Sequence, residues 1–136
     1  MDFQSFDRDA WHSVLLEHPS FVRLSDAVKE GEQATLGGVL GSLFAFISSA
    51  LRRQTKRPVL LLLPSEDEAE GLADDLCHLD GAGSWVHLPS GQDGSRFSIL
   101  DRFVHGQLLG MTVSIGAAVD PVLHPNSLAD SHLVLA

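Results

Sequence analysis

The sequence predicts an α/β fold, a three-layer αβα sandwich with a mostly parallel sheet. Val59–Leu63 is an unbroken apolar run, which is typical of a parallel strand buried on both faces. Segments with strand and helix patterns alternate along the chain, in the order that a parallel sheet with crossover helices requires. A glycine-rich turn at residues 37–41 directly precedes a helical pattern, at the place where sheets of this kind hold phosphate.

A helical arm is expected before this sheet. Apolar residues recur at helical spacing between residues 9 and 29, and Pro19 divides the segment in two. We expect Ser20 to cap the second of these helices and the arm to pack against the main sheet. His12 and His18 are six residues apart, which is not the i,i+4 spacing that places two ligands on one helical face. We therefore expect both histidines at the surface.

The predicted division is an arm at 1–32 and one α/β domain at 33–136. Strands are expected at 33–36, 59–63, 85–88 and 111–115, with a further strand at 133–135. Helices are expected from Leu43 onward and at 66–78, 97–109 and 117–123. Ser65 and Glu68 have the spacing of a capping box at the start of the helix at 66–78. Since the last strand lies so near the final residue, we expect a piece of a larger protein whose next segment covers this edge.

The glycine turn has the shape of a phosphate-binding loop without its chemistry. A working loop reads G-x-x-x-x-G-K-[ST], in which the lysine reaches the phosphates and the hydroxyl holds magnesium. In this chain Leu43 takes the place of the last glycine, Phe44 that of the lysine and Ala45 that of the Ser/Thr. The vestigial loop comprises Gly37, Gly38, Gly41, Ser42, Leu43, Phe44 and Ala45. The interpretation is a degenerate P-loop module, of the RecA-like kind, with no nucleotide, no other cofactor and no metal.

A weak basic patch follows the helix after the turn. It consists of Arg52, Arg53, Lys56 and Arg57. Cations near a helix C-terminus are stabilised by its dipole, and no aromatic side chains are interleaved for base stacking. We therefore expect no strong direct binding of nucleic acid, in agreement with the formal net charge of −9.

Catalytic and metal-binding residues are not evident elsewhere. The carboxylates of the helix at 66–78 are expected on its solvent side, and Cys77–His78 has no second pair at chelating distance. A single cysteine fits a reducing cytoplasm, and the N-terminus lacks the regions of a signal peptide. The longest apolar run is too short to cross a bilayer. The chain is therefore expected to be cytoplasmic, away from membranes, and not an enzyme.

Four stretches resemble the N-terminal region of bacterial transcription-repair coupling factors. They are Leu36–Ser42, Arg57–Pro64, the acidic run Glu66–Leu76 and the final passage Gly110–Leu135. The region is similar to the first domain of the excision-repair helicase, whose loop keeps the lysine that coupling factors lose. Residues 91–98 depart from the aromatic, proline-rich loop of the family.

The resemblance implies a nucleotide-free scaffold or adaptor in transcription-coupled nucleotide excision repair. Its partners would be other domains of the same protein. The damage-recognition protein of excision repair and RNA polymerase would bind through regions absent here, and the ATP-dependent DNA translocase motor would likewise lie elsewhere.

Two alternative functions stay open. One is a doubly wound α/β enzyme that binds a small ligand with groups from residues 37–42, Ser65 and residues 90–93. The other is a protein-interaction domain outside repair.

Overall fold

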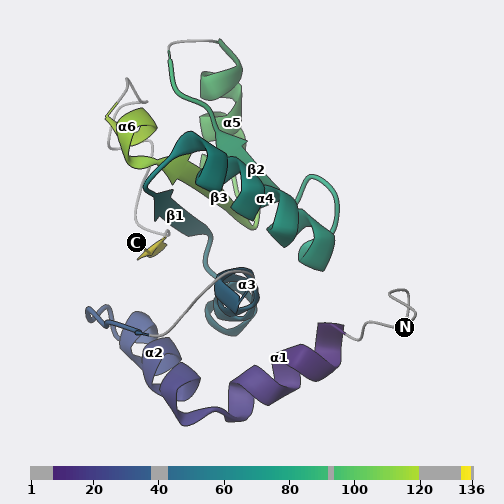
Figure 1. The fold of residues 1–136 in the computed structure, drawn as a ribbon, viewed down its shortest axis with the longest axis vertical. Coiled ribbons are helices and arrows are strands. Elements are labelled where there is room, and N and C mark those ends of the chain that lie inside the picture. The colour runs from purple at the N-terminus through teal and green to yellow at the C-terminus, as the bar shows by residue number, and fades with distance from the viewer. Residues whose placement is uncertain (1–7, 38–42, 92–93, 120–132, 136) are drawn as a thin grey trace.

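The computed structural model describes residues 8–37, 43–91, 94–119 and 133–135 (Figure 1). The helices are α1 (Arg8–Glu17), α2 (Pro19–Lys29), α3 (Leu43–Thr55), α4 (Glu66–Asp80), α5 (Gly94–Val104) and α6 (Ile115–Ala118). The strands are β1 (Val59–Leu63), β2 (Trp85–Leu88), β3 (Gly110–Ser114) and β4 (Leu133–Leu135). The predicted α/β class is confirmed.

The described strands form one small parallel sheet in the order β2-β3-β1-β4. β1 lies inside the sheet, with Val59 opposite Gly110 of β3 on one side and opposite Leu133 of β4 on the other. β2 continues the sheet beyond β3, with Trp85 opposite Gly110. The apolar run of β1 is therefore explained by its central position, as expected for a parallel strand covered on both faces.

Side chains alternate between two apolar clusters on opposite faces of β1. Val59 and Leu61 belong to the cluster shared with α3, α4 and Trp85. Leu60 and Leu62 pack against the cluster that α5 and α6 share with β3. Because successive residues of a strand point to opposite faces, these two clusters place helices on both sides of the sheet.

The helical arm packs on α3 instead of the sheet. α1 and α2 bury a shared cluster against Ile47, Ala50 and Leu51 of α3, and Figure 1 shows α3 between the arm and the strands. The break at Pro19 is confirmed, but the predicted cap is wrong. His18 is the N-cap of α2, with Nδ1 accepting the backbone N–H of Ser20, because Pro19 takes the first helical position.

Several predicted elements are misplaced, and β3 lies one residue earlier than the predicted 111–115. Residues 33–36 form no strand, since residues 33–35 are exposed and Leu36 packs against the cluster of the arm and α3. α5 lies earlier than the predicted 97–109 and ends at Val104, before Gly106 at φ 71°. α6 begins at Ile115 because Ser114 caps it by accepting the N–H of Ala117, and residues 120–123 of the predicted helix lie outside the described residues.

The N-cap predicted at Ser65 is confirmed, and Glu68 reaches back to the Ser65 hydroxyl. Ser65 Oγ accepts the N–H of Glu68 at 3.2 Å and donates to its carboxylate at 3.1 Å. α4 then continues to Asp80, two residues beyond the predicted end. Among the described helices, none has the length and apolarity needed to span a bilayer.

Candidate functional site

The vestigial phosphate loop is described only at its two ends. Gly38, Gly41 and Ser42 lie outside the described residues, and Gly37 before them is exposed. Leu43 opens α3 and is 36% exposed.

The two residues at the lysine and Ser/Thr positions of a working loop pack inward. Ala45 is 1% exposed and belongs to the cluster with Val59 and Leu61, and half-buried Phe44 packs against the same cluster. Neither residue carries a charge or a metal ligand. This end of α3 is therefore a packing surface between a helix and the sheet.

The predicted basic patch does not form one exposed set of cations. Arg52 and Arg53 are half-buried, whereas Lys56 and Arg57 are exposed. Lys56 has φ 57° and ends α3, with its N–H bound to the carbonyl of Arg52. Arg53 is held by two carboxylates within the protein.

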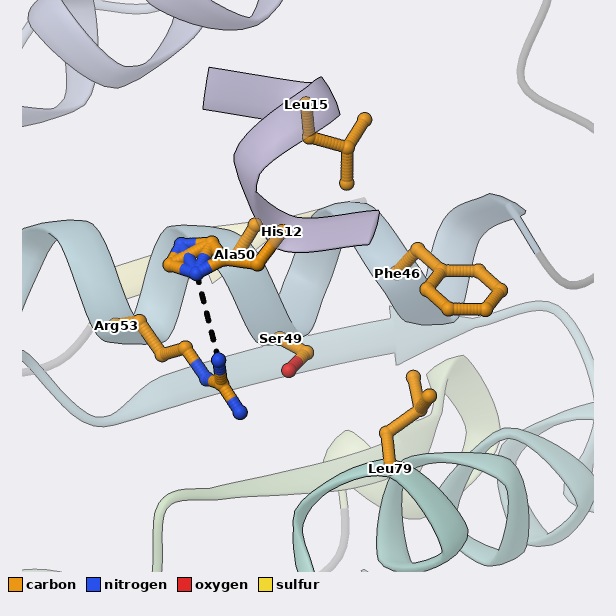
Figure 2. A pocket seen from close by; sticks show the side chains of 7 residues that line it. All are labelled: His12, Leu15, Phe46, Ser49, Ala50, Arg53 and Leu79. Carbon is orange, nitrogen blue, oxygen red and sulfur yellow. Dashed lines mark hydrogen bonds between the residues drawn. The ribbon is translucent and has the colours of Figure 1, made fainter. Parts of the chain in front are cut away.

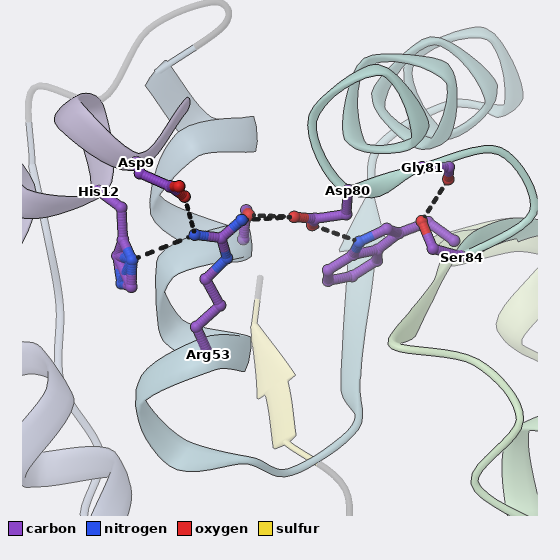
Figure 3. A network of polar contacts seen from close by, with 8 residues as sticks. Asp9, His12, Arg53, Asp80, Gly81 and Ser84 are labelled. Carbon is purple, nitrogen blue, oxygen red and sulfur yellow. Dashed lines mark hydrogen bonds and ion pairs between the residues drawn. The ribbon is translucent and has the colours of Figure 1, made fainter. Parts of the chain in front are cut away.

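Arg53 is the centre of a polar network that joins the arm to the α/β domain (Figure 3). Its Nη1 lies 3.3 Å from Asp9 Oδ1 and 3.4 Å from His12 Nδ1, both on α1. Its Nη2 lies 3.7 Å from Oδ1 of Asp80 at the end of α4. The Asp80 side chain is 4% exposed, while that of Asp9 is 82% exposed. The pair with Asp80 is therefore the less screened of the two.

Asp80 gains two further donors. Ser49 Oγ and Trp85 Nε1 donate to its Oδ1 and Oδ2, each at 2.9 Å. Because a buried carboxylate must be neutralised and hydrogen-bonded, these donors together with Arg53 keep Asp80 in the interior as an anion.

His12 is not the surface residue that its spacing suggested. Arg53 can only donate, so His12 Nδ1 accepts and the ring proton sits on Nε2, which is buried without a hydrogen-bond partner among the described residues. Burial and, next, the positive charge of Arg53 lower the pKa of His12 from its ordinary 6.5, against the opposing effect of Asp9 and Asp80. The cavity beside this ring, drawn in Figure 2, measures about 10 Å³, room for about one water.

A second polar cluster lies at the carboxyl ends of the strands. Ser114 Oγ, at the end of β3, donates to Glu66 Oε1 at 2.6 Å, and His87 Nε2 of β2 lies 3.0 Å from Glu66 Oε2. Glu66 is therefore turned toward the sheet, although the carboxylates of α4 were expected on its solvent side. Ser65 is the N-cap of α4, and the predicted ligand set lies only partly within the described residues, because residues 38–42 and 92–93 fall outside them.

Arg96 is a buried cation that the sequence patterns did not reveal. It is 0% exposed, and its guanidinium donates to the carbonyls of Pro89 at 2.7 Å and Ala117 at 2.8 Å. Arg96 and Asp80 share a sequence signal that could have marked them. Each charge sits at the helix end that the dipole disfavours, which indicates a specific partner.

The described residues include no group of three or more His, Cys, Asp or Glu side chains that could hold a metal ion. Comparisons of the chain with protein-family models, with curated proteins and with solved structures gave no match.

Proposed function

We propose that this chain is the N-terminal, nucleotide-free scaffold module of a transcription-repair coupling factor. Its fold would be a degenerate P-loop domain in a three-layer αβα arrangement. Its role would be that of an adaptor in transcription-coupled nucleotide excision repair. It would pack against other domains of the same protein, with the damage-recognition protein of excision repair and RNA polymerase bound through regions elsewhere.

The observation that carries this proposal is the inward packing of Phe44 and Ala45. A nucleotide-binding loop needs a cation and a metal-binding hydroxyl at these two positions, facing the phosphates. Here both side chains stabilise the contact between α3 and the sheet. A scaffold needs the fold for packing but needs no phosphate-binding side chains, so phenylalanine and alanine at the lysine and Ser/Thr positions fit this role.

Electrostatics at the start of α4 support the same proposal. Glu66, Asp67 and Glu68 stand directly after β1, at the carboxyl edge of the sheet where doubly wound proteins bind nucleotides. Three carboxylates at this point repel a triphosphate. The basic residues at the end of α3 lie near the opposite, amino end of β1, so they do not offset this charge.

Calorimetry with Mg-ATP tests the proposal that this module binds no nucleotide. We expect no saturable binding at millimolar ATP and no hydrolysis above background, because neither the lysine nor the hydroxyl is present. Saturable binding that is lost on Gly38→Ala or Gly41→Ala would contradict the proposal.

The proposed assignment to the coupling-factor family has a separate test. If the reading frame continues past residue 136 into an ATP-driven motor, the longer protein should melt at a higher temperature than this chain. A frame that encodes no motor would contradict the coupling-factor assignment and favour an interaction domain outside repair.

The cluster at Glu66 favours a second candidate, a doubly wound domain that binds a small polar ligand. In the sheet order β2-β3-β1-β4, the connection after β1 runs to β2 at one edge of the sheet, and the connection after β3 runs to β4 at the other edge. Because these two connections run in opposite directions, the topological switch point falls between β1 and β3. Ligands of such sheets bind at this point. Glu66, His87 and Ser114 meet there. A small molecule whose binding is lost on Glu66→Gln, in a protein with unchanged melting temperature, would favour this candidate over the scaffold.

A further inference from the structure

A cavity lies where α1, α2 and α3 meet. It has a volume of about 270 Å³. It is lined by Leu15, His18, Ser20, Phe21, Leu36, Gly37, Leu43 and Ile47. Five of these eight residues are aliphatic or aromatic, and Phe21 and Ile47 form its buried floor at 4% and 8% exposure.

The size of the cavity bounds its occupant. An apolar cavity of about 150 Å³ accommodates benzene, so about 270 Å³ corresponds to a ligand of about ten non-hydrogen atoms. A nucleotide is far larger and needs charged partners that this lining does not offer. The cavity is therefore distinct from a residual nucleotide site, although Gly37 and Leu43 of the vestigial loop contribute to its wall.

The polar groups of the lining select the head of such a ligand. His18 Nδ1 accepts the N–H of Ser20, so Nε2 carries the proton of the neutral ring and donates, and the Ser20 hydroxyl can donate as well. Donors at the wall call for a hydrogen-bond acceptor. The described lining contains no lysine or arginine to pair with a carboxylate, so an uncharged acceptor avoids the cost of burying an unpaired charge.

We propose that this cavity binds a small uncharged amphiphile of about ten non-hydrogen atoms, with an apolar body and one hydrogen-bond-accepting head placed at His18 and Ser20. The inference goes beyond the scaffold role and does not depend on it. The apolar walls would supply the affinity by excluding water, and the two donors would fix the orientation.

The experiment is a titration of the chain with 1-octanol, followed by backbone amide NMR shifts. We expect saturable shifts centred on Leu15, Leu36 and Ile47, with a dissociation constant of about 1 mM or below. Sodium octanoate, which has the same chain length and a charged head, should bind more weakly. Shifts that do not saturate, shifts that map to another part of the chain, or a lower dissociation constant for octanoate than for octanol would overturn the proposal.

Matched variants locate the ligand. Leu43→Trp adds bulk from the rim of the cavity at a residue that is 36% exposed, and it should weaken octanol binding at least tenfold. Val14→Trp is the control, because Val14 is 62% exposed on α1 and does not line the cavity. Equal binding by both variants would overturn the proposal. Leu36→Trp, in the irregular segment before the vestigial loop, replaces Leu43→Trp if circular dichroism shows that the latter is unfolded.

Discussion

Trp85 and Asp80 are joined by a 2.9 Å hydrogen bond from the indole Nε1 to Oδ2 of the carboxylate, across the turn that connects α4 to β2. Both side chains are buried, and the other oxygen of Asp80 faces Ser49 and Arg53 of α3. The same carboxylate thus fixes the first strand position of β2, the end of α4 and, through Arg53, the attachment of α1. This buried anion thus adds a polar link between the helical arm and the sheet to the apolar packing of the arm on α3.

Removal of this anion should destabilise the protein despite its place on α4. An acidic residue at a helix C-terminus is unfavourable by about 0.3–1 kcal/mol, so Asp80→Ala would be stabilising if only the helix dipole mattered. We expect instead a loss of about 3 kcal/mol in the free energy of unfolding, since Arg53, Ser49 and Trp85 lose their acceptor. Urea denaturation followed by tryptophan fluorescence measures this. The control Asp75→Ala, on the exposed side of α4, should change stability by less than about 0.5 kcal/mol.

Two glycines should respond to alanine in opposite ways. A Cβ on Gly110 would overlap the ring of Trp85 and the carbonyl of Val59, so Gly110→Ala should cost about 1–3 kcal/mol. Gly71 lies inside α4 with open space around its Cα, so Gly71→Ala should stabilise the protein by roughly 1 kcal/mol through helix propensity. Thermal melts of both variants give the comparison. A neutral Gly110→Ala would mean that Trp85 does not pack over β3.

The sequence pattern predicted the elements far better than their pairing. The apolar run of β1, the N-cap at Ser65 and the break at Pro19 are local signals, and each was confirmed. The strand order was not encoded locally, because it depends on which crossover passes over which neighbour. The strand expected at 33–36 failed since a short extended pattern without a partner strand cannot satisfy its backbone groups as a ladder.

The sequence pattern did not reveal the polar residues that make the long-range contacts in the structure. Periodicity identifies apolar faces, whereas the roles of Asp80, Arg96 and Glu66 depend on atoms far away in the chain. Asp80 meets Ser49 at a separation of 31 residues, and Glu66 meets Ser114 at 48. A charge opposed to the helix dipole is the one local sign that such a partner exists, and it applies to Asp80 and Arg96 but not to Glu66.

Phe44 should contribute to stability in proportion to its partial burial. A fully buried phenylalanine costs about 3–5 kcal/mol on truncation, and Phe44 is only half-buried against the cluster with Val59, so Phe44→Ala should cost about 2 kcal/mol. Phe103 is 6% exposed, so Phe103→Ala should cost the full amount of about 3–5 kcal/mol. Phe97→Ala, at 37% exposure, should cost about 1 kcal/mol or less. If Phe44→Ala melts like the parent, this position of the vestigial loop does not pack as described.

The attachment of α1 should weaken as the pH falls. The pKa of His12 is lowered in the folded protein, chiefly by burial and next by Arg53, so below the ordinary value of 6.5 the unfolded chain binds more protons than the folded one. The contribution of His12 is therefore fully present above pH 6.5 and is lost as the pH falls from there through the lower folded pKa. Protonation would also remove the acceptor at Nδ1 and place two cations side by side at Arg53.

Urea denaturation at about pH 7.5 and about pH 5.5 should show a smaller loss of stability in His12→Asn, whose amide oxygen can still accept from Arg53, than in the parent. Ser13→Ala, a neighbouring change on α1 without a titrating group, should retain the full loss, and an equal loss in His12→Asn would contradict the assignment.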